Sequence, residues 1–396
     1  MVSLGTQPGS SLFFISSCKP PGVPVQIQKS IDSVSAILVP DKREGICNYN
    51  LRMLSGDEIV ITGETNIPEA KKNIADFLAG RGLIVHDSII ILPDTSEISK
   101  VWGLVSVSVC NIKSEPSHSG EMVSQAIMGT PVKILKKKWS WLLVQTPDYY
   151  IGWANDSGIE EMSEKEITDW KRSPRLIYTG KSGDIISDSE DVAVVSDIVS
   201  GAIVNIIGEK GGYYLVRLPD GRDGRIIKNE AADFARWCLN TDPDVAKLIP
   251  FSKSLTGSPY MWGGTSTKAP DCSGFVKTIY FTGGIILARD ASLQFHHGTP
   301  VNISLSFDSL QPGDLLFFGR LNDDGKQSIT HTGMYIGNTE VIHASGMVRI
   351  NSLDSTRSNY SNYLKETVMG ARRIIGTDSE KGVEHVALHT WYNIQN

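Results

Sequence analysis

Hydrophobic and polar positions near the start of the chain show two periodicities, one typical of strands and one typical of a helix, and together they predict a small folded module. Residues 58–62 and 88–92 are short runs rich in β-branched apolar residues, which is typical of strands. Residues 67–78, between them, space their apolar residues as one face of a helix does. We therefore predict a small αβ module over residues 31–97. The Ser-, Pro- and Gly-rich residues 1–30 are predicted to be a signal or linker.

The middle of the chain repeats itself with a period of 72 residues. Seven residues of the first copy recur, without a gap, 72 positions later in the second. Each copy has short β-branched stretches interrupted by a Pro-Asp turn and a glycine, a pattern that favours a small β-barrel with tight turns. The copies are predicted to span residues 98–165 and 166–232. The matching residues are Gly129, Val132, Ile134, Val144, Pro147, Asp148 and Gly152, followed by Gly201, Val204, Ile206, Val216, Pro219, Asp220 and Gly224.

The last third of the chain, residues 233–376, mixes helical and strand-like patterns. An amphipathic helix ends near Ser254, and a second helix is predicted to begin at Asp271. Strand-like runs follow at 314–318, 333–336 and 340–344. This order predicts a domain with its helices first and its sheet after, followed by an apolar tail at 377–396. The fold class is therefore α+β and multidomain.

Composition sets limits on the function. A chain of 396 residues is too long for one hydrophobic core, and 40% hydrophobic with 21% charged residues is an ordinary globular composition. The net charge of −6 provides no basic surface for phosphate groups, so nucleic acid is not an expected partner. The sequence has no run of roughly 18 apolar residues, so no transmembrane span is expected either.

The N-terminus contains a pattern that bears on localisation. An apolar run with small residues at 10–17 directly precedes Cys18, as at the end of a bacterial lipoprotein signal, although no basic residue comes before it. The pattern predicts export to the bacterial cell envelope with a lipid anchor at Cys18. The alternative is a plain linker and a cytoplasmic protein.

The five cysteines are scattered along the chain, so they do not indicate a disulfide scaffold or a zinc site. One of them is a candidate reactive thiol. We expect no metal and no cofactor, because the spacings match no zinc site. Cys272 follows Asp271, a good helix N-cap, and the start of a helix lowers the pKa of a thiol. Ser273 and Gly274 permit close packing there. The remaining interior cysteines are expected to be small buried apolar residues: Cys47, Cys110 and Cys238.

Two histidines, His331 and His343, lie twelve residues apart in neighbouring strand-like segments. If these strands pair, His331 can serve as the base for Cys272, while His343 holds the far nitrogen of His331 and fixes its tautomer. Spacing alone leaves structural histidines equally open. A zinc site on these three residues is disfavoured, because no fourth ligand is visible.

Four motifs together resemble the NlpC/P60 cysteine peptidases: residues 271–277 (DCSGFVK), 311–318 (QPGDLLFF), 331–337 (HTGMYIG) and 341–343 (VIH). The resemblance covers roughly residues 235–376. It implies a papain-like domain that hydrolyses the γ-D-glutamyl–diamino acid bond of peptidoglycan stem peptides. Cys272 is then the nucleophile, and His331 and His343 complete the triad. Tyr260 matches the family tyrosine that stabilises the oxyanion together with the Cys272 N–H.

The repeats resemble the bacterial SH3 domain, and residues 31–97 weakly resemble BON-type modules. Two such repeats before an NlpC/P60 domain are similar to the γ-D-glutamyl-L-diamino acid endopeptidases of the dipeptidyl-peptidase VI type. That resemblance implies murein tri- or tetrapeptides with a free N-terminal L-Ala as partners, and a role in murein peptide recycling. Glu121 and Tyr150 would bind the ammonium group, and four residues would line the peptide: Trp262, Asp271, Ser273 and Ser292.

Several alternatives stay open at this point. Tyr260 and Trp262 are also typical core aromatics, and Glu121 is equally typical of a solvated surface. The same residues are also consistent with a non-catalytic protein that binds cell-wall fragments, or with an enzyme that transfers the acyl group to an amine. Whether the diamino acid is diaminopimelate or lysine does not follow from the sequence.

Overall fold

The computed structural model describes residues 22–189, 192–303 and 307–393, and the described chain forms two compact units. One unit comprises the described residues up to Lys42 together with Ile46–Ile91. The other comprises Arg43–Gly45 together with the described residues from Leu92 onward. Among the described helices, none is both long and apolar enough to cross a membrane. The lipoprotein-like pattern ending at Cys18 lies outside the described residues.

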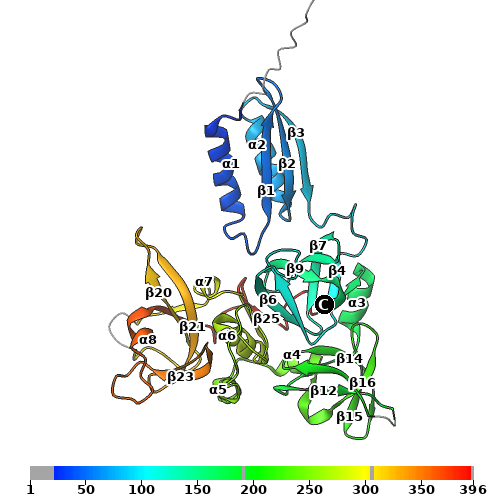
Figure 1. Ribbon diagram of the computed structural model, residues 1–396, viewed down its shortest axis with the longest axis vertical. Coiled ribbons are helices and arrows are strands. Elements are labelled where there is room, and N and C mark those ends of the chain that lie inside the picture. Colours follow the sequence, from blue (N-terminus) through cyan, green and yellow to red (C-terminus); the bar gives the residue numbers. More distant parts are fainter. Residues whose placement is uncertain (1–21, 190–191, 304–306, 394–396) are drawn as a thin grey trace, which may run out of the picture. The chain divides into compact units, whose positions relative to one another are not determined.

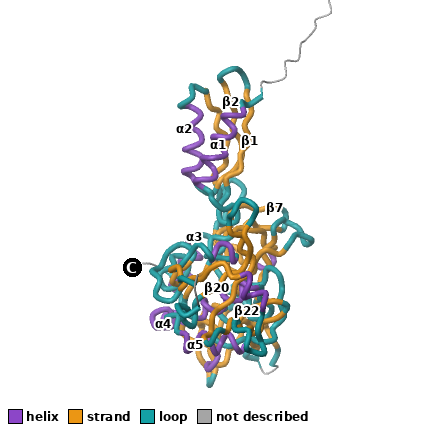
Figure 2. The backbone as a smooth tube through the Cα atoms, turned by 90° about the vertical axis from the view of Figure 1, so that its left-hand side faces the viewer, coloured by secondary structure: helices purple, strands orange, loops and turns teal. Residues whose placement is uncertain are grey.

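The N-terminal unit is a three-stranded sheet in the order β1-β2-β3, with β1 antiparallel and β3 parallel to β2. Both helices lie beside the strands (Figures 1 and 2), and side chains from both join one apolar core with Ile59 and Ile61 of β2. The elements are α1 (Val25–Leu38), β1 (Cys47–Met53), β2 (Glu58–Thr65), α2 (Pro68–Ala79) and β3 (Ile84–Ile91).

Three of these five elements correspond to the predicted strand, helix and strand. The predicted boundary at residue 30 is wrong, because α1 begins at Val25 and buries Ile31 in the module's core. The prolines before it suggested a linker, yet Pro24 lies at the N-cap of α1, where the missing N–H costs no helical hydrogen bond. Strand β1 was also missed.

The two predicted repeats are two seven-stranded sheets with the same topology. The strand order in the first is β10-β4-β7-β8-β9-β5-β6. In the second it is β13-β12-β16-β15-β14-β11-β17, which is the same order read from the other edge of the sheet. A short helix, α3 (Glu164–Arg172), connects them. The first contains β4 (Trp102–Val105), β5 (Val109–Lys113), β6 (Met122–Ile127), β7 (Pro131–Lys138), β8 (Trp141–Gln145), β9 (Ile151–Asn155), η1 (Asp156–Gly158) and β10 (Ile159–Met162). The second contains β11 (Arg175–Tyr178), β12 (Ser182–Ile186), β13 (Val194–Val199), β14 (Ile203–Lys210), β15 (Tyr213–Arg217), β16 (Asp223–Ile227), η2 (Lys228–Glu230) and β17 (Ala231–Asp233).

The repeated glycines have the same physical role in both copies. Gly129 and Gly201 both adopt positive φ, at 78° and 86°, in the turn before a long strand. A Cβ atom at Gly152 would lie 2.5 Å from Ile112, and one at Gly224 would lie 2.5 Å from Ile185. The 72-residue period therefore reflects two copies of one barrel, as predicted.

The C-terminal domain packs helices against a six-stranded sheet in the order β19-β24-β20-β21-β22-β23. Helix α6 lies on β21 and β22, and its Phe275 and Ile279 join Phe317, Met334 and Ile342 in the core. This is the predicted α+β arrangement. Its elements are α4 (Phe234–Asn240), α5 (Val245–Ser254), α6 (Cys272–Thr282), β18 (Ile285–Leu287), α7 (Ala291–Gln294), β19 (Thr299–Val301), β20 (Leu315–Leu321), β21 (Gln327–Gly337), β22 (Glu340–Ser345), β23 (Met347–Ser352), α8 (Asn362–Thr367), β24 (Val368–Arg373) and β25 (Val383–His385).

The C-terminal tail has a structural role. Strand β25 pairs with β18 of the C-terminal domain. Beyond it, Val386 and Tyr392 are fully buried in a cluster that includes Trp102 of the first barrel and Ile177 of the second. The tail thus ties both barrels to the C-terminal domain.

Candidate active site

Cys272 is the first residue of α6, and the chain before the helix is folded tightly onto it. The Asp271 carboxylate caps the helix by accepting the Gly274 N–H at 2.7 Å, and it also accepts the Gly263 N–H at 3.0 Å. A Cβ atom at Gly274 would lie 1.9 Å from the Gly264 carbonyl oxygen, so only glycine fits there. The cap and the glycine together fix the position of the thiol, whose residue is only 8% exposed.

The protonation state of Cys272 differs from the expectation. Burial raises the pKa of the thiol to about 11, and the negative charge of Asp271 acts in the same direction. The backbone N–H of Thr332 on β21 lowers it, as does that of Ser273 at the start of the helix, but they do not outweigh burial. The environment therefore favours the neutral thiol.

The base is part of a directed relay of hydrogen bonds. His331 on β21 and His343 on β22 lie on paired antiparallel strands, and their Nε2 and Nδ1 atoms are 2.8 Å apart. His343 Nε2 lies 3.0 Å from Asn351 Oδ1. The orientation of the Asn351 amide is set, because its Nδ2 donates to the Asn359 carbonyl at 3.0 Å.

This relay fixes the tautomer of both rings. Because Asn351 presents an oxygen, His343 donates from Nε2 and accepts at Nδ1. His331 then donates from Nε2 to His343, so the basic nitrogen of His331 is Nδ1. Burial lowers the pKa of His331 to about 3, and a lowered pKa is also found for His343. The base is therefore neutral in the free enzyme. Sequence reasoning missed Asn351.

Tyr260 lies close to the nucleophile, since the charges of Cys272 and Asp271 are among the causes that shift its pKa. Burial, the largest cause, raises this pKa, so the phenol stays protonated at neutral pH. A protonated phenol can donate a hydrogen bond to an oxyanion. Tyr260 lines a cavity together with Cys272, and its ring also packs against the core of the domain.

A cavity of about 430 Å³ extends from Cys272 to the first barrel. This volume is in the range of small-ligand sites. All six residues predicted to bind substrate line it: Glu121, Tyr150, Trp262, Asp271, Ser273 and Ser292. His331 and His343 line a neighbouring cavity, and Thr330 borders both. Cys272 and His331 thus line two adjoining cavities, and the backbone N–H of Thr332, next to His331 on β21, donates to the Cys272 thiol.

The first barrel forms one end of this cavity. The Trp262 indole N–H donates to the Glu121 carboxylate at 2.8 Å, and Trp262 is 63% exposed, which excludes the alternative of a core tryptophan. Tyr150 is buried, and burial raises the pKa of its phenol. The exposed Glu121 carboxylate forms no ion pair with any of the described residues, and it lines the same cavity as Arg43 and Asp290.

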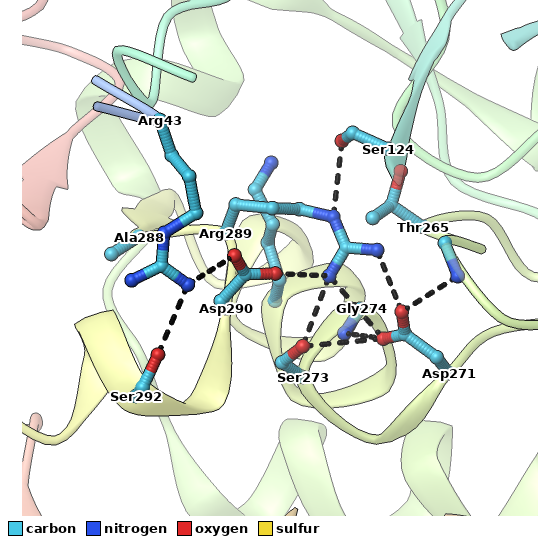
Figure 3. Close-up of polar contacts among 12 residues, drawn as sticks. Arg43, Ser124, Thr265, Asp271, Ser273, Gly274, Ala288, Arg289, Asp290 and Ser292 are labelled. Carbon is cyan, nitrogen blue, oxygen red and sulfur yellow. Dashed lines mark hydrogen bonds and ion pairs between the residues drawn. The ribbon is translucent and has the colours of Figure 1, made fainter. Parts of the chain in front are cut away.

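Beneath the cavity lies a network that sequence reasoning did not find (Figure 3). Arg289, only 1% exposed, donates to the Asp271 carboxylate at 2.6 Å, to Ser273 Oγ at 3.0 Å and to Ser124 Oγ of β6 at 3.0 Å. The neighbouring Asp290 is ion-paired with Arg43 at 2.7 Å. An arginine between a short strand and a four-residue helix gives no sequence signal, because its partners come from distant segments.

Comparison with known proteins supports the assignment of the domains. Residues 257–373 match the model of the NlpC/P60 family, and residues 113–159 match that of the bacterial dipeptidyl-peptidase Sh3 domain. The chain is 28% identical over 292 residues to a γ-D-glutamyl-L-lysine dipeptidyl-peptidase of Bacillus cereus, covering 72% of this chain and 84% of that one. It is 25% identical over 276 residues to dipeptidyl-peptidase 6 of Lysinibacillus sphaericus, covering 67% and 96%.

A solved structure shows the same likeness in three dimensions. The crystal structure of an NlpC/P60 family protein from Bacillus cereus superimposes with a TM-score of 0.58 at 26% identity, covering 69% of this chain and 99% of that one. The second barrel lies outside the segment matched by the SH3 model. It is recognised here from its shared topology with the first.

Proposed function

The chain contains an NlpC/P60 domain and a bacterial SH3 domain, and from this premise we propose that it is a cysteine peptidase of peptidoglycan. Its proposed reaction is hydrolysis of the γ-D-glutamyl–diamino acid bond in stem peptides with a free N-terminal L-Ala. The observation that carries the proposal is a pair of adjoining cavities. One brings the thiol at the start of α6 together with a carboxylate from the first barrel, and the other holds a directed histidine relay.

The geometry supports a sequence of proton transfers in which each group has one task. The Cys272 sulfur attacks the γ-carbonyl carbon while the thiol proton passes to His331 Nδ1. His343 and Asn351 hold that ring in place and stabilise the charge it acquires. The Tyr260 hydroxyl and the Cys272 N–H donate to the developing oxyanion.

Two further steps complete the reaction. The protonated His331 gives its proton to the nitrogen of the diamino acid, the C–N bond breaks, and a thioester on Cys272 remains. Water then loses a proton to His331 and attacks the thioester, which releases the dipeptide and restores the thiol. Because thiol and imidazole are both neutral beforehand, deprotonation accompanies the attack.

The preference for a free amino terminus is proposed from the carboxylate at the first-barrel end of the cavity. A substrate ammonium group that loses water there needs a carboxylate, since an unpaired charge in such a place is costly. Glu121 supplies that carboxylate from the loop before β6, and the Trp262 indole orients it. An N-acylated peptide has no ammonium charge to pair with Glu121, and its acyl group occupies additional space.

The experiment is product analysis by mass spectrometry with the wild type and Cys272→Ala. The substrates are L-Ala-γ-D-Glu-L-Lys, its meso-diaminopimelate counterpart and an N-acetylated copy of each. We expect the wild type alone to release L-Ala-D-Glu, and only from the free-amine peptides. Cleavage of both forms would contradict the ammonium subsite. Tight binding without cleavage would overturn the peptidase and favour a protein that only binds wall fragments.

Export with a lipid anchor at Cys18 remains a proposal from the sequence of residues 10–18. Labelling of the wild type, but not of Cys18→Ala, by radioactive palmitate in a bacterial host would support it. Recovery of unlabelled protein in the cytosol would contradict it.

A further inference from the structure

The proposed substrate carries a second charge that the residues discussed so far leave without a partner. In a γ-D-glutamyl peptide the chain continues through the side-chain carboxyl group, so the α-carboxylate of D-Glu remains free. It lies on the acyl side of the scissile bond and therefore enters the cavity between Cys272 and Glu121. A carboxylate that loses water in such a place needs a cation or several hydrogen-bond donors.

Among the described residues that line this cavity, two are cations, Arg289 and Arg43. Arg289 is buried beneath the wall, with a side chain only 1% exposed, and its donors already serve Asp271, Ser273 and Ser124. The side chain of Arg43 is 36% exposed. Arg43 is therefore the cation of this cavity that a ligand can reach.

Arg43 is held in place by its backbone and by its neighbour in sequence. Its carbonyl oxygen accepts the Ile151 N–H at 2.8 Å, and the carbonyl oxygen of Glu44 accepts from the Gln145 side chain at 3.3 Å. Glu44, whose side chain is 10% exposed, forms an ion pair with Lys381 at 2.6 Å. Residues 43–45 therefore belong to the compact unit that contains the active site, although the chain on both sides of them belongs to the N-terminal unit.

The guanidinium group is oriented toward the cavity by two further contacts. Its Nη1 atom donates to Asp290 Oδ2 at 2.7 Å and to Ser292 Oγ at 3.1 Å (Figure 3). Ser292 itself lines the cavity and carries a hydroxyl that can also donate. An oriented arginine beside a hydroxyl is a site suited to a carboxylate.

We propose that Arg43, together with Ser292, binds the α-carboxylate of the D-glutamyl residue and makes the enzyme prefer D-Glu over its α-amide, D-isoglutamine. This inference rests on the proposed function and adds a specificity-determining residue to it. Arg43 lies outside the two segments that match known domain families, residues 113–159 and 257–373.

The test compares two substrates that differ in one group, L-Ala-γ-D-Glu-L-Lys and the same peptide with D-isoglutamine. We expect the wild type to prefer the carboxylate peptide by about tenfold to a hundredfold in kcat/KM, the range for a charged hydrogen bond. Arg43→Met should lose this factor on the carboxylate peptide, chiefly through KM, and stay within about threefold of the wild type on the amide. Arg43→Lys should retain part of the preference.

Two controls separate direct binding from indirect effects. Lys42→Met removes a neighbouring, exposed positive charge and should leave both rates unchanged. Arg43→Met also uncovers Asp290, which would repel a carboxylate. Repulsion by Asp290 could by itself account for the loss of the carboxylate preference in Arg43→Met. In that case the double variant Arg43→Met/Asp290→Asn would again prefer the carboxylate peptide, and the inference would be overturned. Equal losses of Arg43→Met on both peptides, or no loss on either, would overturn it as well.

Calorimetric binding measurements test the role of Arg43 independently of the proposed peptidase activity. If the wild type cleaves neither peptide, the peptidase proposal fails, and the binding of the dipeptides L-Ala-γ-D-Glu and L-Ala-D-isoglutamine then decides the role of Arg43. A preference for the carboxylate dipeptide that disappears in Arg43→Met supports the inference. Equal affinity for both dipeptides, or no binding of either, contradicts it.

Discussion

The two barrels share one topology, yet among the described residues only those of the first barrel line the active-site cavity. Glu121 and Tyr150 face the cavity from the first barrel, whereas the positions 72 residues later are Ala193 and Arg222. The second barrel contacts the catalytic domain through buried residues such as Ile177 and Ile203, and at the surface through the Lys268–Asp197 ion pair. The difference teaches that the repeat provides a scaffold, while residues at the ends of strands provide the site.

The largest expected effect concerns how each barrel is joined to the catalytic domain. Arg289→Met leaves the buried Asp271 without its ion pair and Ser124 of the first barrel without its donor, so we expect a loss of about 3–5 kcal/mol in the free energy of unfolding. Lys268→Met breaks an ion pair whose side chains are both 47% exposed, and should cost about 0–1 kcal/mol. Urea denaturation measures the free energy of unfolding of both variants. Similar losses in the two variants would contradict the expected difference between them.

The next effect concerns recognition. Glu121→Gln should raise KM for L-Ala-γ-D-Glu-L-Lys by about tenfold to a hundredfold, because the substrate ammonium loses its charged partner. Arg222→Met, at the position that corresponds to Tyr150 in the second barrel, should leave kinetics unchanged. Steady-state assays on both variants check this. A comparable loss in Arg222→Met would show that the second barrel also takes part in binding.

A third expected effect is a pH dependence of stability that arises in the catalytic domain. Burial lowers the pKa of His331 to about 3, below its ordinary value near 6.5, so between these pH values the unfolded chain binds a proton that the folded chain does not. Stability from this group is therefore complete above pH 6.5 and falls as the pH drops toward 3. His343 shifts in the same direction.

This dependence can be measured by urea denaturation from pH 7 to pH 4. His331→Gln should lose less stability over that interval than the wild type, by up to about 3 kcal/mol, since each pH unit between the two pKa values is worth about 1.4 kcal/mol. Identical pH profiles would mean that His331 is more accessible to solvent than the structure indicates.

The sequence predicted those parts of the fold and site whose signals are local or periodic. The 72-residue period predicted two barrels, and the cap at Asp271 predicted the start of α6. Two elements of the N-terminal unit, α1 and β1, were missed. Prolines concealed the start of α1, and the polar residues alternating in β1 resemble a loop.

The missed site residues have a common reason. Arg43, Arg289 and Asn351 acquire their roles from partners far along the chain or from a fixed amide orientation. No spacing rule reveals such partners. The sign of the thiol's pKa shift was missed similarly, since burial of Cys272 is a property of the folded domain.

The most direct test of the central claim follows the covalent intermediate. Enzyme in excess over L-Ala-γ-D-Glu-L-Lys is quenched in acid at short times, and intact and peptide-mapped masses are recorded. The account predicts a transient L-Ala-γ-D-Glu adduct on the peptide containing Cys272, formed as lysine is released, and neither adduct nor lysine from Cys272→Ala. Lysine released by both proteins without an adduct would contradict it.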